Sequence, residues 1–133
     1  VKFNLRKNKE LNIFDKISWS GRKKRDELIL LFNSHDVILS TSKIETFGLT
    51  VAEGLSRGKP VVVTNAGGFD DFVTTKNGIF SDHTVESYVK AIVAMIENYS
   101  RYNSSKIQND MEAEFSPNAV YGKLHSIYKK YTF

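Results

Sequence analysis

Two glutamates separated by seven residues, Glu45 and Glu53, are the side chains of this sequence with the clearest capacity for chemistry. A carboxylate can accept hydrogen bonds from two neighbouring hydroxyl groups at once, so the pair could hold a ligand rich in hydroxyls. Eight glutamates in 133 residues make such a spacing common by chance, and spacing alone leaves open that both are solvated surface acids. The residues around them therefore decide the interpretation.

The residues between the two glutamates predict the start of a helix. Thr46 is a candidate N-cap, and the peptide N–H groups of Phe47, Gly48 and Leu49 would lack partners within the helix. A helix start carries partial positive charge and can bind phosphate, and a glycine lets a ligand approach the backbone closely. We expect these groups and both glutamates to face one cleft.

Composition and charge narrow the function classes. The chain is 41% hydrophobic and 26% charged, which predicts one globular domain over residues 1–133. The absence of cysteine excludes disulfides, Cys-ligated zinc and a thiol nucleophile. The formal charge of +4 comes from 19 Lys and Arg against 15 acids. Much of the basic excess lies in runs at 2–9 and 22–25, and either run could be merely solvated. Neither is interleaved with base-stacking aromatics, so we expect no nucleic-acid partner.

Short apolar runs bounded by turn residues predict the strands that would position these groups. They are continuous Val, Ile and Leu, which is typical of a parallel sheet covered by helices on both faces. Ligands of such sheets bind beyond the carboxyl ends of the strands. The predicted strands, about four, are residues 17–19, 37–39, 61–63 and 79–80.

Helical periodicity fills the segments between and after these strands. A short helix is expected at Asp70 and Asp71, and Ser116 followed by Pro117 predicts an N-cap with proline in the first turn. The order of elements predicts an open, doubly wound α/β fold of the Rossmann type. The longer predicted helices are 24–33, 46–57, 85–96, 104–114 and the segment after 117. The aromatics expected in the core are Trp19, Phe32, Tyr128 and Tyr131.

The segment after Leu39, STSKIETFGLTVAEGLSRGKPVVVTNAGG, resembles the donor-binding half of retaining GT-B glycosyltransferases of the glycosyl transferases group 1 type. Their pattern runs roughly PSxxExFGxxxxEAxAxGxPVVxxxxGG. The resemblance extends over nearly the whole chain from about residue 11. Thr41, Thr46 and Gly54 depart from it, where the family usually has Pro, Gly and Ala. The resemblance implies a Rossmann-like half of a GT-B fold.

The resemblance also implies residue roles. Glu45 would be the catalytic residue, contacting the hydroxyls of the donor sugar, and Glu53 would bind the ribose of the nucleotide. For Arg22, beside the nucleobase, a solvated helix start is the alternative, and Gly67 and Gly68 would either pack closely or simply form a turn. The other residues to which the resemblance assigns donor binding are Thr46, Phe47, Gly48, Leu49 and Gly21.

The implied reaction moves a sugar from a nucleotide diphosphate sugar to an acceptor with retained configuration, in polysaccharide or glycoconjugate synthesis. The sequence has no Asp-x-Asp pair, so we expect neither a metal ion nor a cofactor. Ser40 and Ser42 lie outside a Gly-x-Ser-x-Gly elbow, which argues against a hydrolase triad. An epimerase or phosphorylase would need different acids or a cofactor lysine. A noncatalytic α/β module that binds a nucleotide or a partner stays open.

The ends of the sequence indicate a piece of a longer protein, because it begins with Val1 and its methionines are Met95 and Met111. We expect a C-terminal, donor-binding domain that turns over no substrate without an N-terminal domain, which would supply the acceptor site. The full protein is expected in the cytoplasm, and peripheral contact with an anionic membrane at its inner face stays open.

Overall fold

The computed structural model describes residues 16–131 of the chain. They belong to two compact units, Val1–Leu30 and Leu31–Phe133. The basic run at 2–9 lies outside the described residues. Between residues 16 and 131, no helix is long and apolar enough to cross a membrane.

In its described part, the first unit forms no strand. Residues 17–19, predicted as a strand, are irregular, and Trp19, predicted in the core, is 54% exposed. An extended run becomes a strand only where a neighbouring strand supplies hydrogen-bond partners, and the described part of this unit offers no such neighbour. The predicted helix that begins here is confirmed as α2 (Arg25–Asn33), with the N–H of Lys24 donating to Glu27 Oε2 at 2.8 Å.

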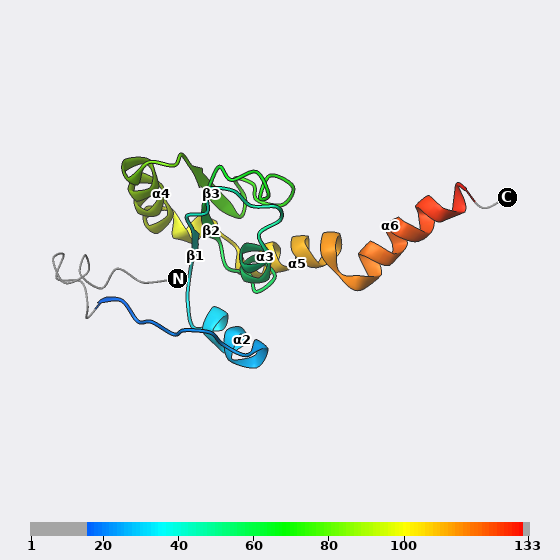
Figure 1. The fold of residues 1–133 in the computed structure, drawn as a ribbon, viewed down its shortest axis with the longest axis horizontal. Coiled ribbons are helices and arrows are strands. Elements are labelled where there is room, and N and C mark those ends of the chain that lie inside the picture. Colours follow the sequence, from blue (N-terminus) through cyan, green and yellow to red (C-terminus); the bar gives the residue numbers. More distant parts are fainter. Residues whose placement is uncertain (1–15, 132–133) are drawn as a thin grey trace. The chain divides into compact units, whose positions relative to one another are not determined.

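The second unit is built on three parallel strands, β1 (Ile38–Ser40), β2 (Val61–Thr64) and β3 (Gly78–Ser81), in the order β1-β2-β3 (Figure 1). Ile38 of β1 stands in register with Val61 of β2. The predicted α/β class with an open parallel sheet is confirmed, with three strands in the described chain where about four were predicted.

Helices cover both faces of this sheet. Successive residues of β2 point to opposite faces, and each face packs against a different helix. Val61 and Val63 pack into a core cluster with α3 (Leu49–Leu55), whereas Val62 packs against α4 (Val85–Glu97). All three valines are fully buried. Figure 1 shows α3 and α4 on opposite sides of the strands. This is the doubly wound arrangement that the continuous apolar strands predict.

The connection from β2 to β3 forms turns, so the short helix predicted at Asp70 and Asp71 is wrong. The side chain of Asn77 accepts a hydrogen bond from the N–H of Thr74 at 2.7 Å and donates one to the carbonyl of Phe72 at 2.8 Å. Asn77 thereby satisfies backbone groups that a longer helix would have paired, and the chain turns into β3.

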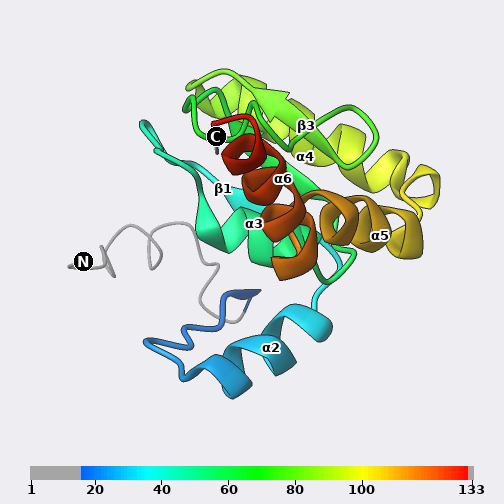
Figure 2. The same ribbon diagram turned by 90° about the vertical axis from the view of Figure 1, so that its right-hand side faces the viewer.

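The C-terminal helices begin largely as predicted. The side chain of Ser116 caps the last helix, with Pro117 in its first turn. That helix, α6 (Pro117–Lys129), follows α5 (Ser104–Phe115) directly, as Figure 1 and Figure 2 show, and none of its described residues is buried. Tyr128 and Tyr131 are therefore 69% and 77% exposed, against the prediction, while Phe32 is buried as predicted. The elements after α4 are the 3-10 helix η2 (Tyr99–Arg101), α5 (Ser104–Phe115) and α6 (Pro117–Lys129).

Leu55 tests how strongly the α3 face of the core stabilises the unit. Its side chain is fully buried, so Leu55→Ala should lower the free energy of unfolding by about 2–5 kcal/mol, measured by urea denaturation. Leu124→Ala in α6 removes the same atoms from a side chain that is 48% exposed, and should cost well under about 2 kcal/mol. Equal losses in the two variants would contradict the assigned core.

Candidate functional site

A hollow of about 340 Å³, the β1 hollow, lies at the carboxyl end of β1. The end of β1, the loop after it, the first turn of α3 and one ring from beyond β2 line it. Parallel α/β sheets place their ligand sites at this edge. The lining residues are Leu39, Ser40, Thr41, Ser42, Glu45, Gly48, Leu49, Thr50, Val51 and Phe69.

Glu45 is the acidic residue of the β1 hollow, and both its backbone and its carboxylate are held. Its N–H donates to the carbonyl of Ala66 at 3.0 Å, and it pairs with Gly67 in an isolated parallel bridge. The hydroxyl of Ser42 donates to Glu45 Oε1 at 3.0 Å. The carboxylate is half-buried, so it is fixed at the edge of the sheet and still reachable from solvent.

Two glycines let the loop of Glu45 pack against the segment after β2. A Cβ on Gly68 would lie 2.6 Å from the peptide nitrogen of Phe47 and 2.8 Å from the carbonyl oxygen of Glu45. A Cβ on Gly48 would lie 2.2 Å from the ring of Phe69, and its φ of 85° is left-handed. Close packing is therefore the role of Gly68, and Gly48 has a packing reason besides its position on the hollow.

Helix α3 begins later than predicted, at Leu49, and its N-cap is Gly48 without a side-chain cap. The prediction of Thr46 as N-cap is wrong, because the left-handed turn at Gly48 intervenes before the helix. Within the described residues, the N–H groups of Gly48, Leu49 and Thr50 have no hydrogen-bond acceptor. These N–H groups are available to a ligand at the β1 hollow.

Phe47 turns its ring away from the hollow and into an aromatic cluster. Its ring centroid lies 5.0 Å from that of Phe72 and 6.0 Å from that of Phe115. Neither Thr46 nor Phe47 lines the β1 hollow. Any contact of Phe47 with a ligand would therefore be made through its backbone.

Glu53 is exposed and is not among the residues that line the β1 hollow. It follows Leu49 and Thr50 by one helical turn, so it lies on the same side of α3, farther from the sheet edge. The structure thus brings Glu45 together with Gly48 and Leu49, and leaves Glu53 outside the β1 hollow.

Gly21 and Arg22 belong to the first unit. Gly21 has a left-handed φ of 60°, and no atom lies within 4 Å of the place its Cβ would take, so conformation explains this glycine. The side chain of Arg22 is exposed. Their roles in donor binding stay predictions.

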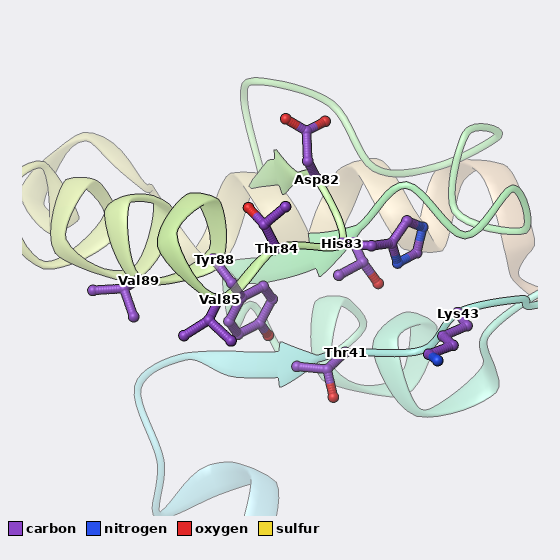
Figure 3. Close-up of a pocket in the computed structure, with 9 residues that line it drawn as sticks. Thr41, Lys43, Asp82, His83, Thr84, Val85, Tyr88 and Val89 are labelled. Atoms are coloured by element: carbon purple, nitrogen blue, oxygen red, sulfur yellow. The ribbon is translucent and has the colours of Figure 1, made fainter.

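A second hollow, of about 230 Å³, lies next to the β1 hollow (Figure 3). Thr41 lines both hollows. His83 Nε2 lies 2.9 Å from the carbonyl oxygen of Asn65, whose amide donates to Asp82 Oδ1 at 3.3 Å. The side chain of His83, two residues after the end of β3, is exposed at this edge of the sheet. Among residues 16–131, no group of three His, Cys, Asp or Glu side chains could hold a metal ion.

Ser42 was considered in the sequence only as a nucleophile, and its contact with Glu45 was missed. The signal was its position three residues before Glu45 in a loop that returns to the same strand edge. Thr64, at the end of β2, donates from its side chain to the carbonyl of Ser42 and was also missed.

Comparison with known proteins identifies the family. Residues 2–113 match the model of the family described as glycosyl transferases group 1. The chain belongs to this family. The Glu45 loop and α3 lie inside the matched segment, so the β1 hollow is part of the family's domain.

Two curated relatives illustrate the likeness in sequence. The chain is 32% identical over 75 residues to mannosylfructose-phosphate synthase of Agrobacterium fabrum. The aligned segment covers 56% of this chain and 16% of that protein. It is 42% identical over 55 residues to sulfoquinovosyl transferase SQD2 of Arabidopsis thaliana, which is 41% of this chain and 11% of that protein. The chain therefore matches a small part of each relative.

Solved structures share the fold at lower sequence identity. Sucrose-phosphate synthase from Thermosynechococcus elongatus superposes with a TM-score of 0.80 at 19% identity, over 92% of this chain and 32% of that one. HepE of Anabaena in complex with UDP superposes with a TM-score of 0.79 at 21% identity, over 94% of this chain and 35% of that one. The fold recurs as about a third of each larger protein.

Gly68 tests the close approach that holds the Glu45 loop. Gly68→Ala places a methyl group against backbone atoms, so we expect it to lower the free energy of unfolding by about 1–3 kcal/mol and to shift the amide resonances of residues 45–47. Gly122→Ala in α6 meets no atom within 4 Å and should stabilise by up to about 1 kcal/mol. A Gly68→Ala variant as stable as the parent would refute the packing.

Tyr88 lines the second hollow and makes stability depend on pH. Burial raises the pKa of Tyr88 from 10.0 to about 12, and a hydrogen bond with the backbone of Ser40 acts in the opposite direction. Between pH 10 and 12 the folded chain keeps a proton that the unfolded chain loses, so the free energy of unfolding falls as pH rises. We expect Tyr88→Phe to flatten this fall in urea titrations, and Tyr121→Phe, at an exposed tyrosine, to leave it. An unchanged slope in Tyr88→Phe would contradict the assignment.

Proposed function

We propose that this chain is the donor-binding part of a retaining glycosyltransferase that uses a nucleotide diphosphate sugar. The observation that carries the proposal is Glu45, a fixed and reachable carboxylate in the β1 hollow, beside the N–H groups of Gly48 and Leu49. An acceptor of hydroxyl protons next to donors for phosphate oxygens matches the two halves of a sugar diphosphate.

In the proposed complex Glu45 accepts hydrogen bonds from hydroxyls of the donor sugar. The N–H groups of the first turn of α3 hold the diphosphate, whose negative charge grows as the glycosidic bond breaks. One positioned donor of this kind lowers a barrier by about 3 kcal/mol, so several together have a large effect on the rate. Glu53, one turn along α3, binds the ribose, and Gly21 and Arg22 border the nucleobase.

The relatives support this choice of ligand. A solved structure of HepE from Anabaena contains UDP and glucose, and a relative of 31% identity from Mycobacterium tuberculosis is named as a GDP-mannose-dependent mannosyltransferase. These names describe those proteins, and they support a nucleotide sugar as the donor for this chain without selecting the base.

We infer that the whole protein carries its acceptor site on residues outside this chain, because the chain spans about a third of the structures that share its fold. The chain would then be the C-terminal domain of a GT-B enzyme, binding donor and transferring nothing alone. We place the whole protein in the cytoplasm, in polysaccharide or glycoconjugate synthesis, with peripheral contact to an anionic membrane as a further proposal.

The test is a titration of the isotope-labelled chain with UDP, GDP and ADP, following amide resonances. We expect shifts at Gly48, Leu49 and Glu53, and the nucleotide with the largest affinity identifies the base. Glu53→Gln should weaken the binding of that nucleotide by about tenfold, because a charged hydrogen bond to the ribose is lost. Glu97→Gln, at an exposed glutamate of α4, should leave the affinity unchanged.

Shifts confined to residues 22–25 would overturn the proposal and favour a noncatalytic interaction module. Equal affinity in Glu53→Gln and in the parent would remove the ribose role of Glu53 alone. Release of free sugar or transfer of sugar by this chain by itself would contradict the assignment of the acceptor site to other residues.

A further inference from the structure

We propose that Ser42 is a positioning residue that orients the Glu45 carboxylate toward the donor sugar, through a chain of hydroxyl groups that starts in β1. The inference rests on the proposed function of Glu45. It adds a residue to that site, and it adds a statement about which carboxylate oxygen meets the ligand.

The hydroxyl chain has a direction. Ser40 at the end of β1 donates from its hydroxyl to Ser42 Oγ at 3.3 Å, and Ser42 donates in turn to Glu45 Oε1 at 3.0 Å. A hydroxyl has one proton to donate, so the proton of Ser42 is committed to the carboxylate while its oxygen accepts from Ser40. Hydrogen bonds in such a chain polarise and strengthen one another.

The backbone of Ser42 is anchored independently of its side chain. Thr64, which is 4% exposed at the end of β2, donates from its hydroxyl to the carbonyl of Ser42. Two residues farther along, the carbonyl of Ala66 accepts the N–H of Glu45. Ser42 is therefore tied to the last residue of β2 and Glu45 to the segment that follows it, and the Ser42 hydroxyl keeps its place relative to the carboxylate.

This arrangement fixes the carboxylate without neutralising it. Within residues 16–131 no lysine or arginine forms an ion pair with Glu45, and Lys43 from the same loop lines the second hollow. Oε1 is occupied by Ser42, and Oε2 has no hydrogen bond among the described residues. Glu45 thus presents Oε2, which is not engaged by the described residues, to a sugar hydroxyl or to positive charge that develops on the sugar ring.

The experiment compares each nucleoside diphosphate with its sugar: UDP with UDP-glucose, and GDP with GDP-mannose. The sugar increment is the ratio of the two dissociation constants, measured by calorimetry on the 133-residue chain. We expect Ser42→Ala to reduce the sugar increment by about 3- to 10-fold and to leave the affinity for the nucleoside diphosphate unchanged. Ser42→Thr, which keeps a hydroxyl, should restore it. Ser126→Ala in α6 is the matched control.

A double-mutant cycle separates the two claims. If Glu45→Gln leaves the sugar increment intact, or if the parent chain has none, the proposed function of Glu45 fails. If Glu45→Gln removes the increment and Ser42→Ala does not change it, the inference about Ser42 fails alone. Ser42→Ala should have no further effect in the Glu45→Gln background, and an equal effect there would mean that Ser42 touches the ligand itself.

A readout without ligand completes the test. The side-chain carboxyl carbon resonance of Glu45 should shift in Ser42→Ala, and the mobility of this side chain should rise, while urea denaturation shows a folded chain. Ser40→Ala should give the same changes at smaller amplitude. An unchanged resonance and unchanged mobility in Ser42→Ala would overturn the inference whatever the ligand data show.

Discussion

The candidate site depends on one interaction, the docking of the loop after β1 onto the end of β2 and the segment that follows it. The carbonyl of Ser42 accepts from the side chain of Thr64, and the N–H of Glu45 donates to Ala66. Gly68 lies so close to the backbone of Glu45 and Phe47 that no Cβ would fit. Without these contacts, nothing described in the structure would hold the carboxylate of Glu45 at the edge of the sheet.

The sheet supplies the rigidity that this docking needs. β2 lies between β1 and β3 and is buried on both faces, so the segment that leaves it starts from a fixed point. Parallel register brings the ends of β1 and β2 to one edge, where the two loops can pair. The site therefore inherits its geometry from the core, and the ligand groups that it offers are mostly backbone atoms and short polar side chains.

Local patterns predicted most of this fold, because they reflect local chemistry. The apolar runs of β1 and β2 and the Ser116 cap depend on neighbours in sequence, and the structure confirms them. Features that depend on distant partners were missed. The run at 17–19 has no strand partner in the described part of its unit, and the contact of Ser42 with Glu45 needed the path of the loop. The glycine at position 54 is explained by a contact that the local sequence does not reveal, since a Cβ there would lie 2.5 Å from Ile38 Cγ1.

The aromatic cluster of Phe47, Phe72 and Phe115 affects the entropy cost of binding a ligand at the β1 hollow. Because the ring of Phe47 packs against the core, the fold itself holds the backbone of the loop beside it. The entropy lost in ordering that loop is then a cost of folding and not of association. Substitutions of Phe72 or Phe115, neither of which lines the hollow, would consequently weaken ligand affinity and thermal stability together.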